Sequence, residues 1–190
     1  MSMKDSLRLL SSVDNKAENK AIQQGLPPVD SWNPPCCGDS GICIGRDGTW
    51  FHQGSPFVRE KLVKMFSRII RLDDDGKYYL VTPVEKMLLT VEDVPFIAVG
   101  FEIVEDARGS NIIFETNVGD KVVVDDTHPF TVHMVNGEPA PYILIRKNLK
   151  ARVARSVYYQ LIDVALEVTQ GEETLMVIES NGEQYELGRF

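Results

Sequence analysis

The chain has 190 residues, of which 43% are hydrophobic and 25% are charged, and its formal net charge is −8 at pH 7. A chain of this length can fold as one ordinary domain or two small lobes, without metal ions or disulfides. The acidic total disfavours DNA or RNA as a polymeric partner, although a single nucleotide in a local basic pocket remains compatible with it.

The cysteines and the apolar segments indicate the cellular compartment in which the protein resides. Cys36 and Cys37 are adjacent, Cys43 makes the number of cysteines odd, and no Cys-x-x-Cys pair occurs, which is typical of reduced thiols. No apolar run reaches the length of a signal-peptide core or a membrane span. We therefore predict a cytoplasmic protein that does not enter a membrane.

The first part of the chain predicts an arm, an extended segment and a hairpin. Residues 1–25 carry small and apolar residues at helical spacing and predict an N-terminal helical arm. Prolines make residues 26–40 extended, because a proline moves its predecessor out of the helical region. Arg46-Asp47-Gly48 then predicts a hairpin turn, with the glycine in the left-handed position.

Two amphipathic helices are expected among strands. Ser55-Pro56 predicts the start of the first helix, with the serine as N-cap. Asn148 predicts the cap of the second, whose apolar stripe starts at Leu149. The intervening segments are rich in β-branched and aromatic residues and predict strands. Asn136-Gly137 and Asn181-Gly182 predict tight hairpin turns between strands.

This order of elements predicts an α+β fold of two small lobes, with a cleft between them. Each lobe would be a mostly antiparallel sheet with one main helix. A strand–helix–strand pattern recurs around residues 42–82 and 141–187, which favours two related units. We expect the arm at 1–25, the N-terminal lobe at 26–82 and the C-terminal lobe at 83–190.

Several familiar motifs fail on order or spacing. Gly38-Asp39-Ser40-Gly41 resembles the nucleophile loop of trypsin-like proteases, but every histidine of the chain follows Ser40, the reverse of that class. Adjacent cysteines seldom converge on one zinc ion. The Asp73–Gly76 turn lacks the acidic first and twelfth positions of a calcium loop. We therefore predict no catalytic set, no metal site and no cofactor.

A cluster of rings, amides and charges near the first hairpin suits a planar, partly anionic small ligand. The predicted ligand-binding residues are Trp32, Asn33, Cys37, Asp39, Arg46, Trp50, His52, Arg59, Thr82, Glu85, Lys86 and His128. The alternative interpretation is that the tryptophans are core anchors and that the prolines shape the connection between the lobes.

Several motifs together resemble an uncharacterised bacterial family known as domain of unknown function 1285. They cover about residues 26–170 and comprise Pro27-Pro28, Trp32–Asp39, Asp47–Trp50, Gly54–Pro56, Asp75–Lys86, Val91–Phe96, Asn117–Asp120, His128-Pro129 and Tyr142–Ile145. The resemblance implies an α+β protein of two lobes with a cleft that takes a nucleotide-like ligand, and a role in signal transduction. Ser40-Gly41 and His52 depart from the family pattern, and no activity is implied.

Three functional hypotheses follow. The first is a non-catalytic binding protein for a small anionic or nucleotide-like ligand in the cleft between the lobes. The second is a hydrolase or transferase that uses Cys37 as nucleophile with His52 or His128 as base. The third is a protein-interaction scaffold, with the proline-rich segment as the surface that a protein partner contacts.

Overall fold

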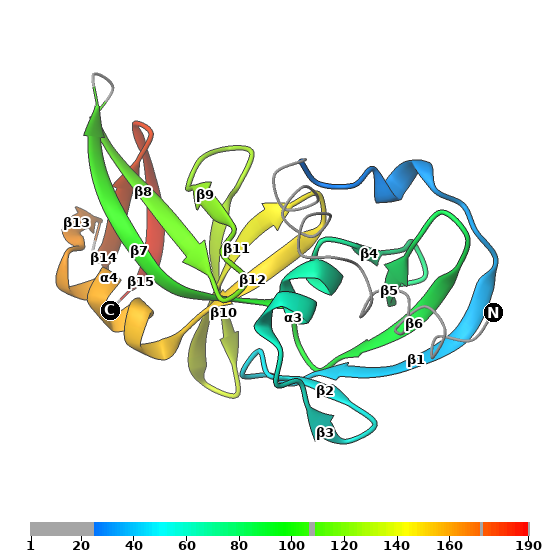
Figure 1. The fold of residues 1–190 in the computed structure, drawn as a ribbon. Coiled ribbons are helices and arrows are strands. Elements are labelled where there is room, and N and C mark those ends of the chain that lie inside the picture. The colour runs from blue at the N-terminus through cyan, green and yellow to red at the C-terminus, as the bar shows by residue number, and fades with distance from the viewer. Residues whose placement is uncertain (1–24, 107–108, 172, 190) are drawn as a thin grey trace. The chain divides into compact units, whose positions relative to one another are not determined.

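The computed structural model describes residues 25–106, 109–171 and 173–189. The chain forms two compact units (Figure 1). Of the described residues, those from Gly25 to Ile44 and from Trp50 to Thr90 form the N-terminal unit, and those from Gly45 to Thr49 and from Val91 to Arg189 form the C-terminal unit. The division after Thr90 lies beyond residue 82, where the sequence placed it. The predicted arm at 1–25 lies, except for Gly25, outside the described residues.

The N-terminal unit is built on a six-stranded sheet with the order β3-β2-β1-β6-β5-β4. Its elements are η1 (Val29–Ser31), β1 (Cys36–Ile44), β2 (Trp50–His52), β3 (Ser55–Pro56), α3 (Glu60–Ser67), β4 (Ile70–Leu72), β5 (Tyr78–Val81) and β6 (Lys86–Val91). The predicted first hairpin is confirmed, because β1 pairs with β2 and Gly48 has a φ of 81° in the turn between them.

The first helix begins later than the sequence predicts. Gln53 and Gly54 take φ values of 50° and 81°, which make a tight turn and pair β2 with β3. Ser55-Pro56 is therefore an edge strand rather than a helix start, and helix α3 begins at Glu60. Strand pairing overrides the capping pattern at this position. Val58, which lies between β3 and α3, is 92% exposed.

The C-terminal unit contains a six-stranded sheet with the order β10-β11-β12-β7-β8-β9 and a three-stranded sheet with the order β13-β14-β15. Its elements are β7 (Phe96–Asp106), β8 (Gly109–Thr116), β9 (Lys121–Val123), β10 (Phe130–Val135), β11 (Glu138–Arg146), β12 (Leu149–Val153), α4 (Arg155–Asp163), β13 (Leu166–Gln170), β14 (Glu173–Ser180) and β15 (Glu183–Arg189). The turns at Asn136-Gly137 and Asn181-Gly182 are confirmed, since all four residues have positive φ.

The second helix also begins later than predicted. Leu149–Val153 forms strand β12, which pairs with β11 and, in parallel, with β7. Leu149, Ala151 and Val153 are buried while the residues between them point outward, which is the period of a strand rather than of a helix. Helix α4 then starts at Arg155. A short apolar run of this kind fits either element, so only its pairing partners decide.

A buried hydroxyl joins the two sheets of the C-terminal unit. Ser180 on β14 donates to the carbonyl of Val124 at 2.7 Å and accepts from the amide of Ile112 on β8 at 3.0 Å. The side chain of Ser180 is fully buried, so both backbone groups depend on it for a partner. This contact fixes the small sheet to the large one.

The predicted class of fold is confirmed as two sheet-rich units with few helices. Each unit has a mostly antiparallel sheet and one described α-helix, α3 or α4. Within the described residues, no helix has the length and apolar composition needed to cross a membrane. The cleft between the lobes stays a prediction.

Candidate functional site

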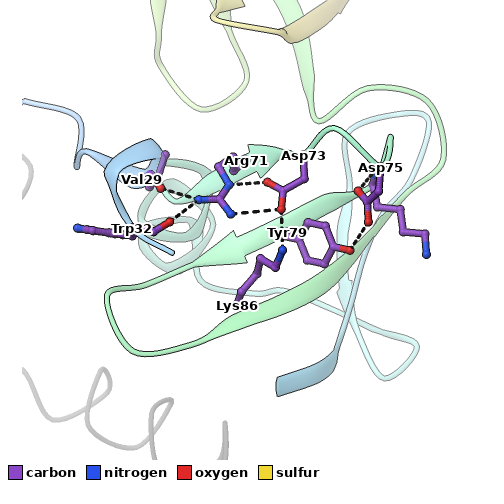
Figure 2. Close-up of polar contacts among 8 residues, drawn as sticks. Val29, Trp32, Arg71, Asp73, Asp75, Tyr79 and Lys86 are labelled. Carbon is purple, nitrogen blue, oxygen red and sulfur yellow. Dashed lines mark hydrogen bonds and ion pairs between the residues drawn. The ribbon is translucent and has the colours of Figure 1, made fainter. Parts of the chain in front are cut away.

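Arg71 is the centre of a polar network in the N-terminal unit (Figure 2). Arg71 lies on strand β4, and its Nε and Nη2 donate to the two carboxylate oxygens of Asp73, which directly follows that strand. Its Nη1 donates to the main-chain carbonyls of Val29 at 2.8 Å and Trp32 at 2.7 Å. The arginine therefore ties the proline-rich segment, far earlier in the chain, to the edge strand β4.

Lys86 and Tyr79 extend this network. The Lys86 Nζ donates to Asp73 at 2.7 Å and lies 4.3 Å from the centre of the Tyr79 ring. The Tyr79 hydroxyl donates to Asp75 at 2.7 Å. The hydrogen bond from Arg71 lowers the pKa of Asp73 against the opposing effect of burial, and the bond to Asp75 raises the pKa of Tyr79 to about 12.

The charges of this network balance within it. Arg71 and Lys86 both donate to Asp73, and Tyr79 donates to Asp75, so two cations and two carboxylates lie in one network. Arg71 and Asp73 are also largely covered, with 14% and 17% of their side chains exposed. A half-buried, internally neutral network stabilises a fold and offers little net field to an anion. We assign the network to holding residues 29–32 in place.

The predicted tryptophans lie in different surroundings. Trp32 is half-buried and packs against the small cluster of Val29, Tyr79 and Val81. Trp50 is 3% exposed, with its ring edge-on to Phe57 at 6.2 Å between ring centres. Among the described residues its Nε1 finds no hydrogen-bond partner. This burial favours the interpretation of Trp50 as a core anchor.

The remaining predicted residues of the N-terminal unit serve local turns or lie exposed. Thr82 and Glu85 close a turn, in which the Thr82 hydroxyl donates to the Glu85 carbonyl and accepts from its amide, both at 3.1 Å. The Asp39 carboxylate accepts from the Gly41 amide at 2.7 Å. Three of these residues are exposed, namely Asn33, Cys37 and Arg59. His52 is half-buried and pairs with Ile42 on β1.

Arg46 and His128 belong to the C-terminal unit. His128 closes the turn before β10, where its amide donates to Asp125 at 2.8 Å and its Nδ1 lies 2.9 Å from the Thr127 hydroxyl oxygen. Arg46 lies exposed in the Gly45–Thr49 loop, and its amide donates to the Glu92 carboxylate at 2.9 Å. Arg46 is therefore anchored through its backbone to Glu92, the residue before Asp93.

Asp93 is the meeting point of a second group of polar residues. The Tyr142 hydroxyl is shared between both oxygens of Asp93, at 3.1 Å each, and Arg152 Nη1 donates to one of them, also at 3.1 Å. Burial and then the Asp93 charge raise the pKa of Tyr142, whereas the charges of Arg152 and Arg46 lower it. The Arg46 guanidinium is thus within electrostatic reach of the Tyr142 hydroxyl.

The register of the sheet explains this gathering. Thr131, Tyr142 and Arg152 are directly paired across β10, β11 and β12, so their side chains share one face. His133 and Lys150 lie two residues from Thr131 and Arg152 along the same strands and join that face. We call these five residues the Tyr142 face. The rings of His133 and Tyr142 are 5.7 Å apart.

Sequence reasoning missed Asp93, Tyr142 and Arg152. The first two lie in motifs quoted for the family resemblance, which was the available signal. Their contact spans 49 residues, and that of Arg152 with Asp93 spans 59, so only strand register reveals the group. In the N-terminal unit, sequence reasoning missed Arg71 and Asp73 because it tested the acidic turn only as a calcium loop.

Comparison with known families matches both parts of the chain. Residues 27–94 match the model described as domain of unknown function (DUF1285), N-terminal domain. Residues 95–187 match the model described as protein of unknown function (DUF1285), C-terminal domain. The comparison with curated proteins gave no match.

Two solved structures are similar to this chain. A DUF1285 family protein from Silicibacter pomeroyi DSS-3 is 38% identical, with a TM-score of 0.78 over 86% of this chain and 87% of that one. A DUF1285 family protein from Shewanella baltica OS155 is 27% identical, with a TM-score of 0.52 over 65% of this chain and 91% of that one. The similarity thus extends across both units.

Proposed function

We propose that this chain, which belongs to the family of domain of unknown function 1285, is a binding protein for a small anionic, nucleotide-like ligand. The ligand would dock on the Tyr142 face of the C-terminal unit. One observation carries the proposal: Arg152 and the Tyr142 hydroxyl, which lie on paired strands, both donate to Asp93, and the amide of Arg46 donates to the neighbouring Glu92.

Arginine is well suited to such a role. Its planar guanidinium presents paired N–H donors that match the oxygens of a phosphate or carboxylate. Arg46 is exposed while its main-chain amide is fixed by Glu92, so the loop holds the position of the residue and leaves the side chain in solvent. Lys150 adds a further exposed cation on the same face.

The same face offers rings for a planar group. His133 is exposed and Tyr142 is half-buried, and their planes are tilted by 52°. A nucleobase could stack on one ring and meet the edge of the other, while its phosphate lies toward the arginines. The proposal thus keeps Arg46 from the sequence prediction, whereas the predicted Lys86 is already paired with Asp73.

Thermal unfolding in the presence of separate anions tests this proposal. Inorganic phosphate and adenosine and guanosine monophosphates are the probes, and titration calorimetry measures their affinities. A ligand at a hundred times its dissociation constant adds about 2.7 kcal/mol to the free energy of unfolding. We expect at least one probe to stabilise the native protein.

Matched variants locate the site. Arg46→Gln should weaken binding at least tenfold, because it removes one guanidinium that would neutralise the anion beside the Tyr142 face. Lys61→Gln is the control, since Lys61 is an exposed cation of the other unit and should leave the affinity unchanged. A flat response of folded native protein to every probe would overturn the proposal. Equal losses in the two variants would remove the site from the Tyr142 face.

The other hypotheses stay predictions. The Cys37 thiol is exposed, and its sulfur donates to the Pro35 carbonyl at 3.6 Å. His52 pairs across the strands with Ile42, which lies five residues after Cys37 on β1. The alkylation rate of Cys37 at neutral pH tests the hydrolase or transferase hypothesis, since a thiolate nucleophile reacts fast. The scaffold, the cytoplasmic location and the signalling role rest on the sequence alone.

A further inference from the structure

The Asp93 carboxylate is held by longer contacts than a comparable ion pair of the same unit. Its three contacts, two with the Tyr142 hydroxyl and one with Arg152, measure 3.1 Å each. Arg146 and Asp120 meet at 2.7 Å. Charge-assisted bonds are usually about 2.7–2.9 Å from nitrogen and shorter from a hydroxyl. The Tyr142 hydroxyl has a single proton, which it shares between the two oxygens of Asp93, so one carboxylate occupies both donors.

We propose that Asp93 is an internal counter-ion which the bound ligand replaces, and that the replacing group is a phosphate monoester rather than a carboxylate. This inference rests on the proposed function and deepens it. Asp93 occupies the place where Arg152 and the Tyr142 hydroxyl converge, so an anion must displace it to reach both donors. The carboxylate thereby sets which anions can bind.

The chemistry of the exchange favours phosphate. A free monocarboxylate would replace Asp93 by a group of the same charge and geometry, and would lose its own freedom of motion on binding. A phosphate monoester carries a charge of about −1.5 to −2 and three terminal oxygens. Its three oxygens can accept from Tyr142 and Arg152 at once and leave one oxygen for a further donor, which the two oxygens of Asp93 do not.

Displacement of Asp93 by phosphate would also loosen the segment that carries it. Asp93 lies in the short segment between β6 and β7, where it and Glu92 are bound to the rest of the C-terminal unit through Tyr142, Arg152 and the Arg46 amide. When phosphate takes the Arg152 and Tyr142 donors, this segment loses part of its attachment. We expect faster hydrogen exchange of the amides around Asp93 in the presence of the ligand.

The test compares two carboxylate variants with two anions. Asp93→Asn removes the competing charge but keeps an oxygen that can accept from Tyr142. Asp120→Asn is the control, because Asp120 also pairs with an arginine of this unit and is exposed to a similar extent, 29% against 21%. Calorimetric titrations of the full chain with inorganic phosphate and with acetate give the affinities.

We expect Asp93→Asn to bind phosphate at least tenfold more tightly than the native protein and to acquire measurable acetate binding. Asp120→Asn should match the native protein. If the native chain binds phosphate and Asp93→Asn does not improve it, or if both variants improve it equally, the inference is wrong and the proposed function stands. Binding by Asp93→Asn alone would show that Asp93 excludes the ligand, which overturns the inference. Absence of phosphate binding in all three proteins overturns the inference, whereas the proposed function falls only if the native protein also fails to bind the two nucleoside monophosphates.

Discussion

The guanidinium of Arg71 donates to the main-chain carbonyl of Trp32 at 2.7 Å. The same side chain holds Val29 and Asp73, so Arg71→Met leaves two carbonyls and a half-buried carboxylate with fewer donors. We expect the free energy of unfolding to fall by about 2–3 kcal/mol. Urea unfolding measures it, with exposed Arg59→Met as a control that should change stability by less than about 0.5 kcal/mol. Equal losses would contradict the anchoring role.

The lowered pKa of Asp73 predicts that the protein loses stability in acid. Its pKa is lowered from 3.8, first by the Arg71 hydrogen bond, so the native state binds the proton less readily than the unfolded chain. The stabilisation is present above pH 3.8 and is lost as the pH falls through the lower native pKa. Asp73→Asn should reduce stability at neutral pH and flatten the acid dependence. Asp74→Asn, at an exposed position of the same turn, should leave the acid dependence as it is.

The raised pKa of Tyr79 predicts a loss of stability at high pH. The hydrogen bond to Asp75, followed by burial, raises its pKa to about 12. A raised native pKa means that the stabilisation is full below pH 10.0 and is lost as the pH rises toward about 12. The tyrosinate absorbance lost in Tyr79→Phe identifies this titration. Asp75→Asn should move it toward pH 10, and an unmoved titration would exclude Asp75 as the cause.

Gly48 and Gly137 allow the cost of close packing to be separated from the cost of backbone strain. Both have φ near 80°, but a Cβ on Gly48 would lie 2.6 Å from the Ile97 side chain, whereas one on Gly137 would meet open space. Gly137→Ala should cost roughly 1–2 kcal/mol from the left-handed backbone alone. Gly48→Ala should cost at least about 1 kcal/mol more, because the loop must move away from Ile97. Thermal or urea unfolding measures both, and equal losses would contradict the tight contact.

Much of the fold follows from local sequence, and the exceptions share one cause. Asn136-Gly137 and Asn181-Gly182 turns and the Gly48 hairpin are fixed by residues that tolerate positive φ, so their chemistry is readable locally. Ser55-Pro56 and Leu149–Val153 were assigned to helices, although both pair with neighbouring strands. Local propensity gave no information on those partners, which tertiary structure supplies.

The candidate site was less predictable than the fold. Arg46 is predicted as a ligand-binding residue from its place beside the first hairpin, and in the structure its amide donates to the Glu92 carboxylate. Tyr142 and Arg152 carry no local signature, because a tyrosine and an arginine in alternating strands are ordinary surface residues. Only the pairing of β11 with β12 brings them to one carboxylate. In the N-terminal unit, residue type alone likewise did not indicate that Lys86 is paired with Asp73.

The contacts of the Gly45–Thr49 loop determine which parts of the chain can be separated from one another. The chain on both sides of it belongs to the N-terminal unit, yet Gly48 packs against Ile97 and its carbonyl accepts from Asn117. The family models divide between residues 94 and 95, which leaves the loop in one half and its partners in the other. The N-terminal half alone, ending at residue 94, would therefore lack the Ile97 side chain and the Asn117 amide that this loop contacts in the structure.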